Sequence, residues 1–201
     1  MSWREKPYIS FRKKRKFKER IENWSMVTWI IIITSIFSVI GFVLFTLPNG
    51  IEYIALKPEN IAQGKYLWTL MTHMFIHGGI MHLLINMFVL FSLGSLSERI
   101  IGRKRFLRLY IVSGILAGLL STILPILYGK SDIGARIVGS PDVFMVGASG
   151  AIFAIAGLFV ILLPRLKFMI IFLPFFSLPA YIMVPLVLFI TWIASVAGDF
   201  P

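Results

Sequence analysis

The sequence contains no cysteine and few charged residues. The absence of cysteine excludes disulfide bonds, cysteine-ligated zinc and thiol catalysis. Only 14% of the 201 residues are charged and 58% are hydrophobic, compared with about 25% and about 45–50% in ordinary globular domains. A chain of this size has too little interior to hide so many apolar side chains from water. The composition therefore excludes an ordinary soluble protein and indicates a membrane protein.

Acidic residues are especially scarce, with 9 Asp and Glu against 20 Lys and Arg. Nine of the 20 basic residues precede Asn23, and we interpret residues 1–22 as a solvated tail beside anionic lipid headgroups. Specific binding of nucleic acid or a partner by this tail is the alternative. Because the positive charge is concentrated in the tail and in loops, the high net charge does not favour a nucleic-acid-binding domain.

Five apolar segments are predicted to be membrane helices. They are residues 25–47, 80–96, 106–128, 147–163 and 180–197. The first carries no charge, reaches about 34 Å as a helix, and is too long for the apolar core of a signal peptide. Prolines interrupt the last apolar block, so we expect residues 168–179 to form an irregular connection. The predicted fold class is an all-α polytopic membrane protein, with residues 23–201 as its membrane domain.

The distribution of basic residues predicts the orientation of these helices. With the N-terminus in the cytoplasm, the inner segments carry 16 Lys and Arg and the outer segments carry four. Cytoplasmic loops are enriched in Lys and Arg. We therefore expect a multi-pass protein, in the cell membrane, with a cytoplasmic N-terminus.

Polar residues at membrane depth are expensive and are candidates for function. His82 and Asn86 lie four residues apart, on one face of the second predicted helix, and Ser149 lies near the start of the fourth. Both helices enter from the outer side, so the three residues are expected at similar depth. The alternatives are that Ser149 bonds to its own backbone and that His82 and Asn86 join two helices.

The neighbours of Ser149 favour a nucleophile. Gly147-Ala148-Ser149-Gly150 opens a helix, whose first amides are unpaired donors. A serine nucleophile needs access for the substrate and donors aimed at the developing oxyanion. The three histidines could indicate a metal site, but no carboxylate or cysteine at membrane depth joins them. We therefore expect neither a metal nor a cofactor.

Several motifs together resemble the rhomboid family of intramembrane serine proteases. In order they are Trp68-x-x-x-Thr72, Phe75-x-His77-Gly78-Gly79-x-x-His82-Leu83-x-x-Asn86, Gly94-x-x-x-Glu98, Gly102-x-x-x-Phe106-x-x-x-Tyr110 and Gly147-Ala148-Ser149-Gly150-Ala151. The resemblance covers residues 60–200. It implies that Ser149 is the nucleophile and that His82 and Asn86 stabilise the oxyanion. It also implies a bundle of six helices, of which five are present here.

One departure from the family concerns the general base, which the resemblance places on a histidine of a sixth helix. All three histidines lie between positions 73 and 82, so we expect a truncated chain that is inactive by itself. The predicted function of the complete protein is cleavage of single-span transmembrane proteins near the outer membrane face by a Ser-His dyad. The alternatives are an inactive rhomboid-like protein that binds transmembrane clients and a small transporter or channel. The sequence leaves the oligomeric state open.

Overall fold

The computed structural model describes residues 24–170 and 173–197, which are mostly helical, as the sequence predicts. The predicted basic tail, residues 1–22, lies outside the described residues. In chain order the elements are α2 (Met26–Leu44), η1 (Gly50–Tyr53), α3 (Pro58–Ala62), α4 (Thr69–Thr72), η2 (His73–Phe75), α5 (Ile80–Val89), η3 (Leu90–Gly94), α6 (Ser95–Ile101), α7 (Arg103–Tyr128), α8 (Asp132–Val138), α9 (Ser149–Leu162), β1 (Lys167–Ile170), β2 (Leu173–Pro179) and α10 (Ala180–Ala197).

Three of the described helices are long and apolar enough to cross a membrane. The first is α2 and the third is α7. The second is the continuous helix Ile80–Ile101, which consists of α5, the π-helical turn η3 and α6. The apolar helices at Ser149–Leu162 and Ala180–Ile193 are shorter. These five helices follow the order of the five predicted segments, and the assignment of the last two as membrane spans stays a prediction.

The second helix extends further than predicted, to Ile101 instead of residue 96. The sequence interpretation ended it before the charged pair Glu98-Arg99. In the structure, Glu98 is buried, and its two carboxylate oxygens accept hydrogen bonds from the backbone amides of Met26 and Val27 at 2.9 and 3.0 Å. These amides belong to the first turn of α2, where a helix has no internal acceptor for them. The paired carboxylate therefore lies inside the fold.

The connection between α9 and α10 also differs from its prediction. Residues 168–179 were expected to be irregular, but β1 and β2 form an antiparallel pair with Lys167 opposite Pro179. Pairing satisfies backbone groups that an irregular segment near lipid would leave without partners. The prolines are tolerated because this sheet has only two strands, and edge strands need not donate every amide.

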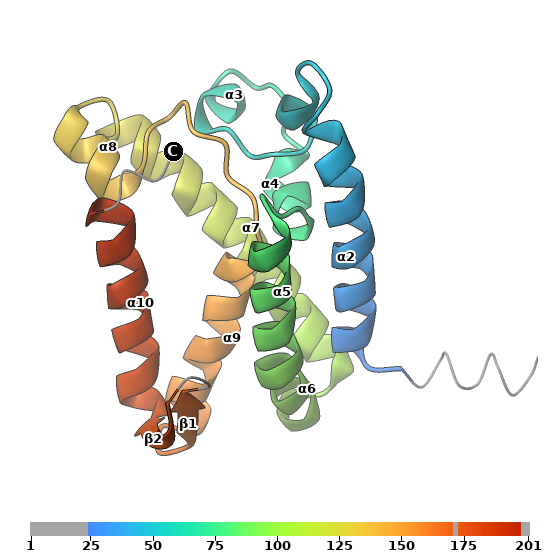
Figure 1. Cartoon of the computed structure of the whole chain (residues 1–201), viewed down its shortest axis with the longest axis vertical. Coiled ribbons are helices and arrows are strands. Elements are labelled where there is room, and N and C mark those ends of the chain that lie inside the picture. The colour runs from blue at the N-terminus through green and yellow to red at the C-terminus, as the bar shows by residue number, and fades with distance from the viewer. Residues whose placement is uncertain (1–23, 171–172, 198–201) are drawn as a thin grey trace, which may run out of the picture.

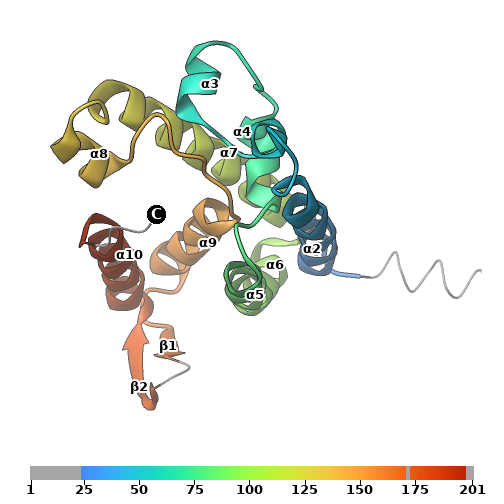
Figure 2. The same cartoon turned by 45° about the horizontal axis from the view of Figure 1, so that its top comes forward.

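The long helix α7 crosses the bundle behind the other helices, and α9 packs against it (Figure 1). Short helices α3 and α8 lie at one end of the molecule, and the β1–β2 hairpin and α6 lie towards the opposite end (Figures 1 and 2). Helix α9 begins in the interior of the bundle, close to the first turn of α5. This arrangement places the residues at the start of α9 below the loops that cover one end.

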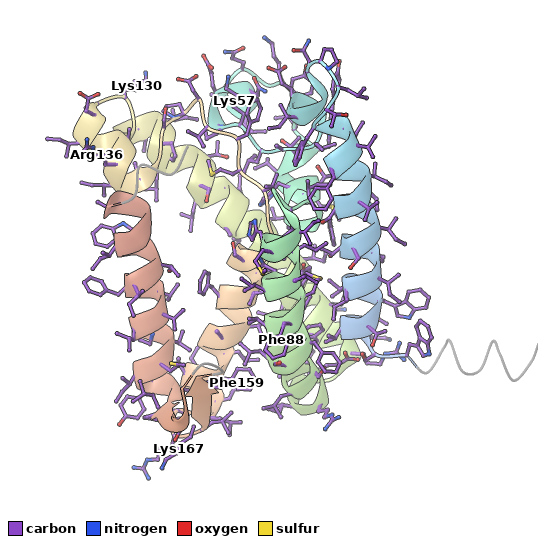
Figure 3. The ribbon with its side chains drawn as sticks, viewed as in Figure 1. Lys57, Phe88, Lys130, Arg136, Phe159 and Lys167 are labelled. Carbon is purple, nitrogen blue, oxygen red and sulfur yellow. The ribbon has the colours of Figure 1, made fainter. Side chains whose placement is uncertain are left out.

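Basic side chains lie at both ends of the bundle. Lys57, Lys130 and Arg136 project at the end that carries α3 and α8, and Lys167 projects at the hairpin end (Figure 3). Between them the outer surface is apolar, as on α2, where Val39 is 58% exposed and Val43 is 61% exposed. Apolar side chains so exposed would be unfavourable in water, and they suit the hydrocarbon of a bilayer.

Candidate active site

The segment before α9 is fixed by backbone hydrogen bonds to the loop between α2 and α5. The amide and carbonyl of Met145 pair with the carbonyl and amide of Leu56 at 2.7 and 2.9 Å, and the Gly147 amide donates to the His73 carbonyl at 2.9 Å. The Ala148 side chain is fully buried. The chain therefore enters α9 in a defined position, and Ser149 is the first residue of that helix.

Gly147 holds the chain in a conformation that other residues rarely adopt, with a φ of +125°. A Cβ atom at this position would lie 3.0 and 3.1 Å from Cε1 and Nε2 of His82 and 3.9 Å from Oγ of Ser149. The imidazole and the hydroxyl are therefore both within 4 Å of the same point. The absence of a side chain at Gly147 keeps the space between these two groups open.

Ser149 is half-buried, and among the residues that the structure describes no side chain forms a hydrogen bond with its Oγ. The first intrahelical bond of α9 runs from the Ile152 amide to the Ala148 carbonyl at 3.0 Å. The amides of residues 149–151 therefore precede the hydrogen-bonded part of the helix and are donors at its positive end. An oxygen that becomes negative beside Ser149 would meet these donors.

Asn86 lies one helical turn beyond His82 and is buried. Its Nδ2 donates to the backbone carbonyl of His82 at 2.9 Å. The structure thus places the His82 ring and the Ser149 hydroxyl near Gly147. The side-chain amide of Asn86 instead forms its hydrogen bond within α5. In this arrangement Asn86 braces the turn of α5 that carries His82.

Close packing between α7 and α9 fixes the position of the start of α9. A Cβ atom on Gly150 would lie 2.5 Å from Cβ of Ala117, and one on Gly114 would lie 3.6 Å from Cβ of Ala151. No larger residue fits at Gly150 without separating the helices. These small residues let α7 and α9 approach closely.

His77 has a role at this site that the sequence interpretation missed. It is fully buried, and its Nε2 accepts a hydrogen bond from the Ala148 amide at 3.4 Å. A backbone amide only donates, so the ring proton lies on Nδ1, which donates to Oγ of Ser38 at 3.0 Å. Burial, together with the neighbouring imidazole of His82, lowers the pKa of His77 to about 4, so the ring is neutral near neutral pH. His77 therefore holds the residue that precedes Ser149.

The three histidines make separate contacts in this region. His73 bonds through Nδ1 to the carbonyl of Thr69 at 2.8 Å, and the rings of His77 and His82 meet edge to face with centroids 5.0 Å apart. Within residues 24–170 and 173–197, no group of three or more His, Asp or Glu side chains is placed to hold a metal ion.

Comparison with known proteins identifies the family of this chain. The Rhomboid domain family model matches residues 64–199. YdcA, a rhomboid relative from Bacillus subtilis (strain 168), is 28% identical over 154 residues, which cover 74% of this chain and 68% of YdcA. The rhomboid protease GluP of the same organism is 37% identical over 107 residues, 53% of this chain and 18% of GluP. RHOMBOID-like protein 4 of Arabidopsis thaliana is 34% identical over 102 residues, 51% of this chain and 22% of that protein.

The aligned part is therefore a small fraction of the length of GluP and of RHOMBOID-like protein 4. The family match nevertheless includes all of α5, α7 and α9, the helices that carry His82, the close packing contact and Ser149. The predicted resemblance is confirmed, and the chain belongs to the rhomboid family of helical integral membrane proteins.

Proposed function

We propose that this chain is the membrane domain of an intramembrane serine endopeptidase, with Ser149 as the nucleophile. The observation that carries the proposal is that the Ser149 hydroxyl and the His82 imidazole both lie within 4 Å of the point that a Cβ atom on Gly147 would occupy, at the start of α9. GluP, which the chain resembles, is named a rhomboid protease. A serine placed beside oriented donors is the arrangement that acyl transfer requires.

The proposed reaction proceeds through an acyl-enzyme. The Ser149 oxygen attacks the carbonyl carbon of the scissile peptide bond, and a base takes the hydroxyl proton and passes it to the departing amine. Water then attacks the ester, and the new carboxyl group leaves as Ser149 regains its proton. During each attack the carbonyl oxygen becomes negative, and His82 and the first amides of α9 stabilise that charge. Asn86 supports this role by bracing the turn that carries His82.

The general base in this proposal is a histidine that the 201 residues do not include. Both ring nitrogens of His77 are hydrogen-bonded, to Ser38 and to the Ala148 amide, and Nδ1 of His73 is bonded to the Thr69 carbonyl. His82 is assigned to the oxyanion, in line with the family resemblance. A serine hydroxyl without a positioned base is a poor nucleophile, so residues 1–201 alone are expected to be inactive.

The proposed substrates are single-span transmembrane proteins, cut near the outer membrane face. A mostly apolar groove of about 390 Å³ lies between α5 and η3 on one side and α9 and α10 on the other. Phe88 of α5, Ile152 of α9 and Val187 of α10 line it, and Phe88 lies between the two basic ends of the bundle (Figure 3). An apolar groove at this depth suits a membrane helix or the unwound end of one.

The central test compares Ser149→Ala with Ser113→Ala in the full-length gene product, using one transmembrane substrate in proteoliposomes. Ser113 is a matched control, since it is also in a helix and its hydroxyl donates to the carbonyl of Leu109. We expect Ser149→Ala to abolish cleavage with little change in thermal stability, and Ser113→Ala to retain it. Residues 1–201, assayed in parallel with the full-length protein, should not cleave the substrate. Cleavage by Ser149→Ala above a few per cent of the wild-type rate would place the nucleophile elsewhere.

A second test distinguishes an oxyanion role for His82 from a role as base. Loss of one oxyanion donor costs about 10²–10³ in rate, so His82→Ala should impair cleavage but still permit labelling of Ser149 by a reactive phosphonate. Loss of labelling would make His82 the base. If the full-length wild-type protein binds transmembrane clients and cleaves none, the inactive rhomboid-like alternative replaces the proposal.

A further inference from the structure

A second cavity lies at the end of the bundle where α2 begins, α6 ends and α7 begins, opposite α3 and α8 (Figure 1). Its volume is about 590 Å³, and it shares no lining residue with the groove beside α10 except Ser92. None of its lining residues belongs to the proposed catalytic group. The cavity therefore needs an explanation of its own.

Two hydrogen-bond donors from α6 enter this cavity. Ser95 and Arg99 both line the cavity and are four residues apart, so they lie on one face of the helix. In the part of the chain that the structure describes, neither the Ser95 hydroxyl nor the Arg99 guanidinium has a hydrogen-bonding or ionic partner. A guanidinium beside a hydroxyl can bind two oxygens of a phosphate group.

The one acidic residue that lines the cavity does not neutralise Arg99. The Glu98 carboxylate accepts from the amides of Met26 and Val27, and its Oε1 lies 3.8 Å from Nε of Arg103. Arg103 also donates through Nη2 to the Trp24 carbonyl at 2.8 Å. The cavity therefore keeps an excess of positive charge, to which the first turn of α7 adds the positive end of a long helix dipole.

Two apolar side chains, Phe91 and Leu96, line another part of the cavity wall and are open to the outside, and the Ser25 and Ser92 hydroxyls that also line the cavity are hydrogen-bonded within the fold. Phe91 is 60% exposed and Leu96 is 36% exposed. Trp24, which is 40% exposed, packs on Trp29 with ring centroids 5.6 Å apart at the same end of the bundle. Tryptophan gathers at the boundary between hydrocarbon and headgroups. The cavity thus joins a cationic, hydroxyl-bearing part to an apolar part at the level of a membrane surface.

We propose that this cavity binds the phosphate of an anionic glycerophospholipid. Arg99 and Ser95 donate to the phosphate oxygens, Arg103 adds positive charge, and the acyl chains lie along Phe91 and Leu96. A free phosphate ion would use the donors and leave the apolar wall uncovered, so the lipid fits the whole cavity. The bound lipid would join the start of α2 to α6 and α7, and the site is independent of the proposed protease activity.

The test measures lipid binding to the purified chain by native mass spectrometry, with dioleoylphosphatidylglycerol and dioleoylphosphatidylcholine as the two probes. We expect saturable binding that is tighter for phosphatidylglycerol. Arg99→Gln should weaken that binding about tenfold or more, because a charge-assisted hydrogen bond is lost. Ser95→Ala should weaken it roughly threefold. Arg136→Gln removes the same charge from an exposed position on α8 and should leave binding unchanged.

Inorganic phosphate is the third probe and separates the two sources of a phosphate group. We expect no displacement of phosphatidylglycerol by millimolar phosphate. Displacement that Arg99→Gln abolishes would identify a site for soluble phosphate and overturn the lipid assignment. Equal binding of the two lipids, or equal effects of Arg99→Gln and Arg136→Gln, would also overturn it.

Discussion

Replacement of Gly147 by alanine tests whether the open space between His82 and Ser149 is a requirement of the fold and of the site. Alanine at a φ of +125° is strained, and such backbone strain costs about 1–3 kcal/mol. The new methyl group would also lie 3.0 Å from Cε1 of His82. The ring is at the exposed end of a side chain and can move by a few tenths of an ångström, so the strain dominates. We expect Gly147→Ala to lower the unfolding free energy by about 1–3 kcal/mol.

Gly157→Ala is the matched control for this prediction. Gly157 lies within α9, has no positive φ, and has nothing within 4 Å of the position of an added Cβ. Alanine in a helix interior is favoured over glycine by up to about 1 kcal/mol. The same chemical change should thus lower stability at position 147 and raise it slightly at position 157.

Thermal unfolding of the two variants in detergent measures this contrast. For a chain of this size 1 kcal/mol corresponds to about 2–4 °C, so Gly147→Ala should lower the midpoint by about 2–12 °C. In the full-length protein it should also reduce cleavage, by up to the roughly 10²–10³ that loss of one oxyanion donor costs, because the new methyl group displaces the His82 ring. If the two variants showed the same shift in the midpoint of thermal unfolding, and Gly147→Ala cleaved substrate at the wild-type rate, the proposed requirement for glycine at position 147 would be wrong.

Three further predictions concern other parts of the molecule. Burial and the neighbouring His82 lower the pKa of His77 to about 4 in the folded protein, compared with about 6.5 in an unfolded chain. The unfolded chain therefore binds a proton at His77 more readily, and the free energy of unfolding is largest above pH 6.5 and falls as the pH falls. Unfolding free energy should drop by about 2 kcal/mol from pH 7.5 to pH 5, and His77→Gln should flatten this part of the dependence. Glu98→Ala leaves two amides of α2 without acceptors and should destabilise the protein by roughly 2–5 kcal/mol in denaturant titrations. Glu59→Ala removes a half-exposed carboxylate that is paired with Lys57 and should change stability by less than about 1 kcal/mol. A cysteine placed at Ser131 should react with an impermeant label in intact cells, and reaction only after lysis would reverse the proposed orientation.

The sequence alone determined the class of fold and the set of residues to consider. Long apolar segments separated by short polar ones permit only a bundle of membrane helices, because lipid offers no partners to an unpaired backbone. Polar residues are so rare at membrane depth that His82, Asn86 and Ser149 were conspicuous candidates. The motifs around them identified the family, which the comparisons confirmed. Each of these conclusions depends on local composition and residue spacing, which can be read from the sequence without a structure.

The tertiary structure alone decided how distant residues meet. His77 bonds to Ser38 and Ala148, 39 and 71 residues away in the chain, and Glu98 bonds to Val27 at a separation of 71. No periodicity in the sequence indicates such pairs. The motifs that contain His77 and Glu98 therefore did not predict the hydrogen bonds that these two side chains make. The same limit applies to Gly147, since its positive φ and its place beside His82 follow from the packing of α9 on α7. Contacts between residues far apart in the chain form only when helices pack against one another. The pattern of residues along the sequence does not specify which helix faces meet.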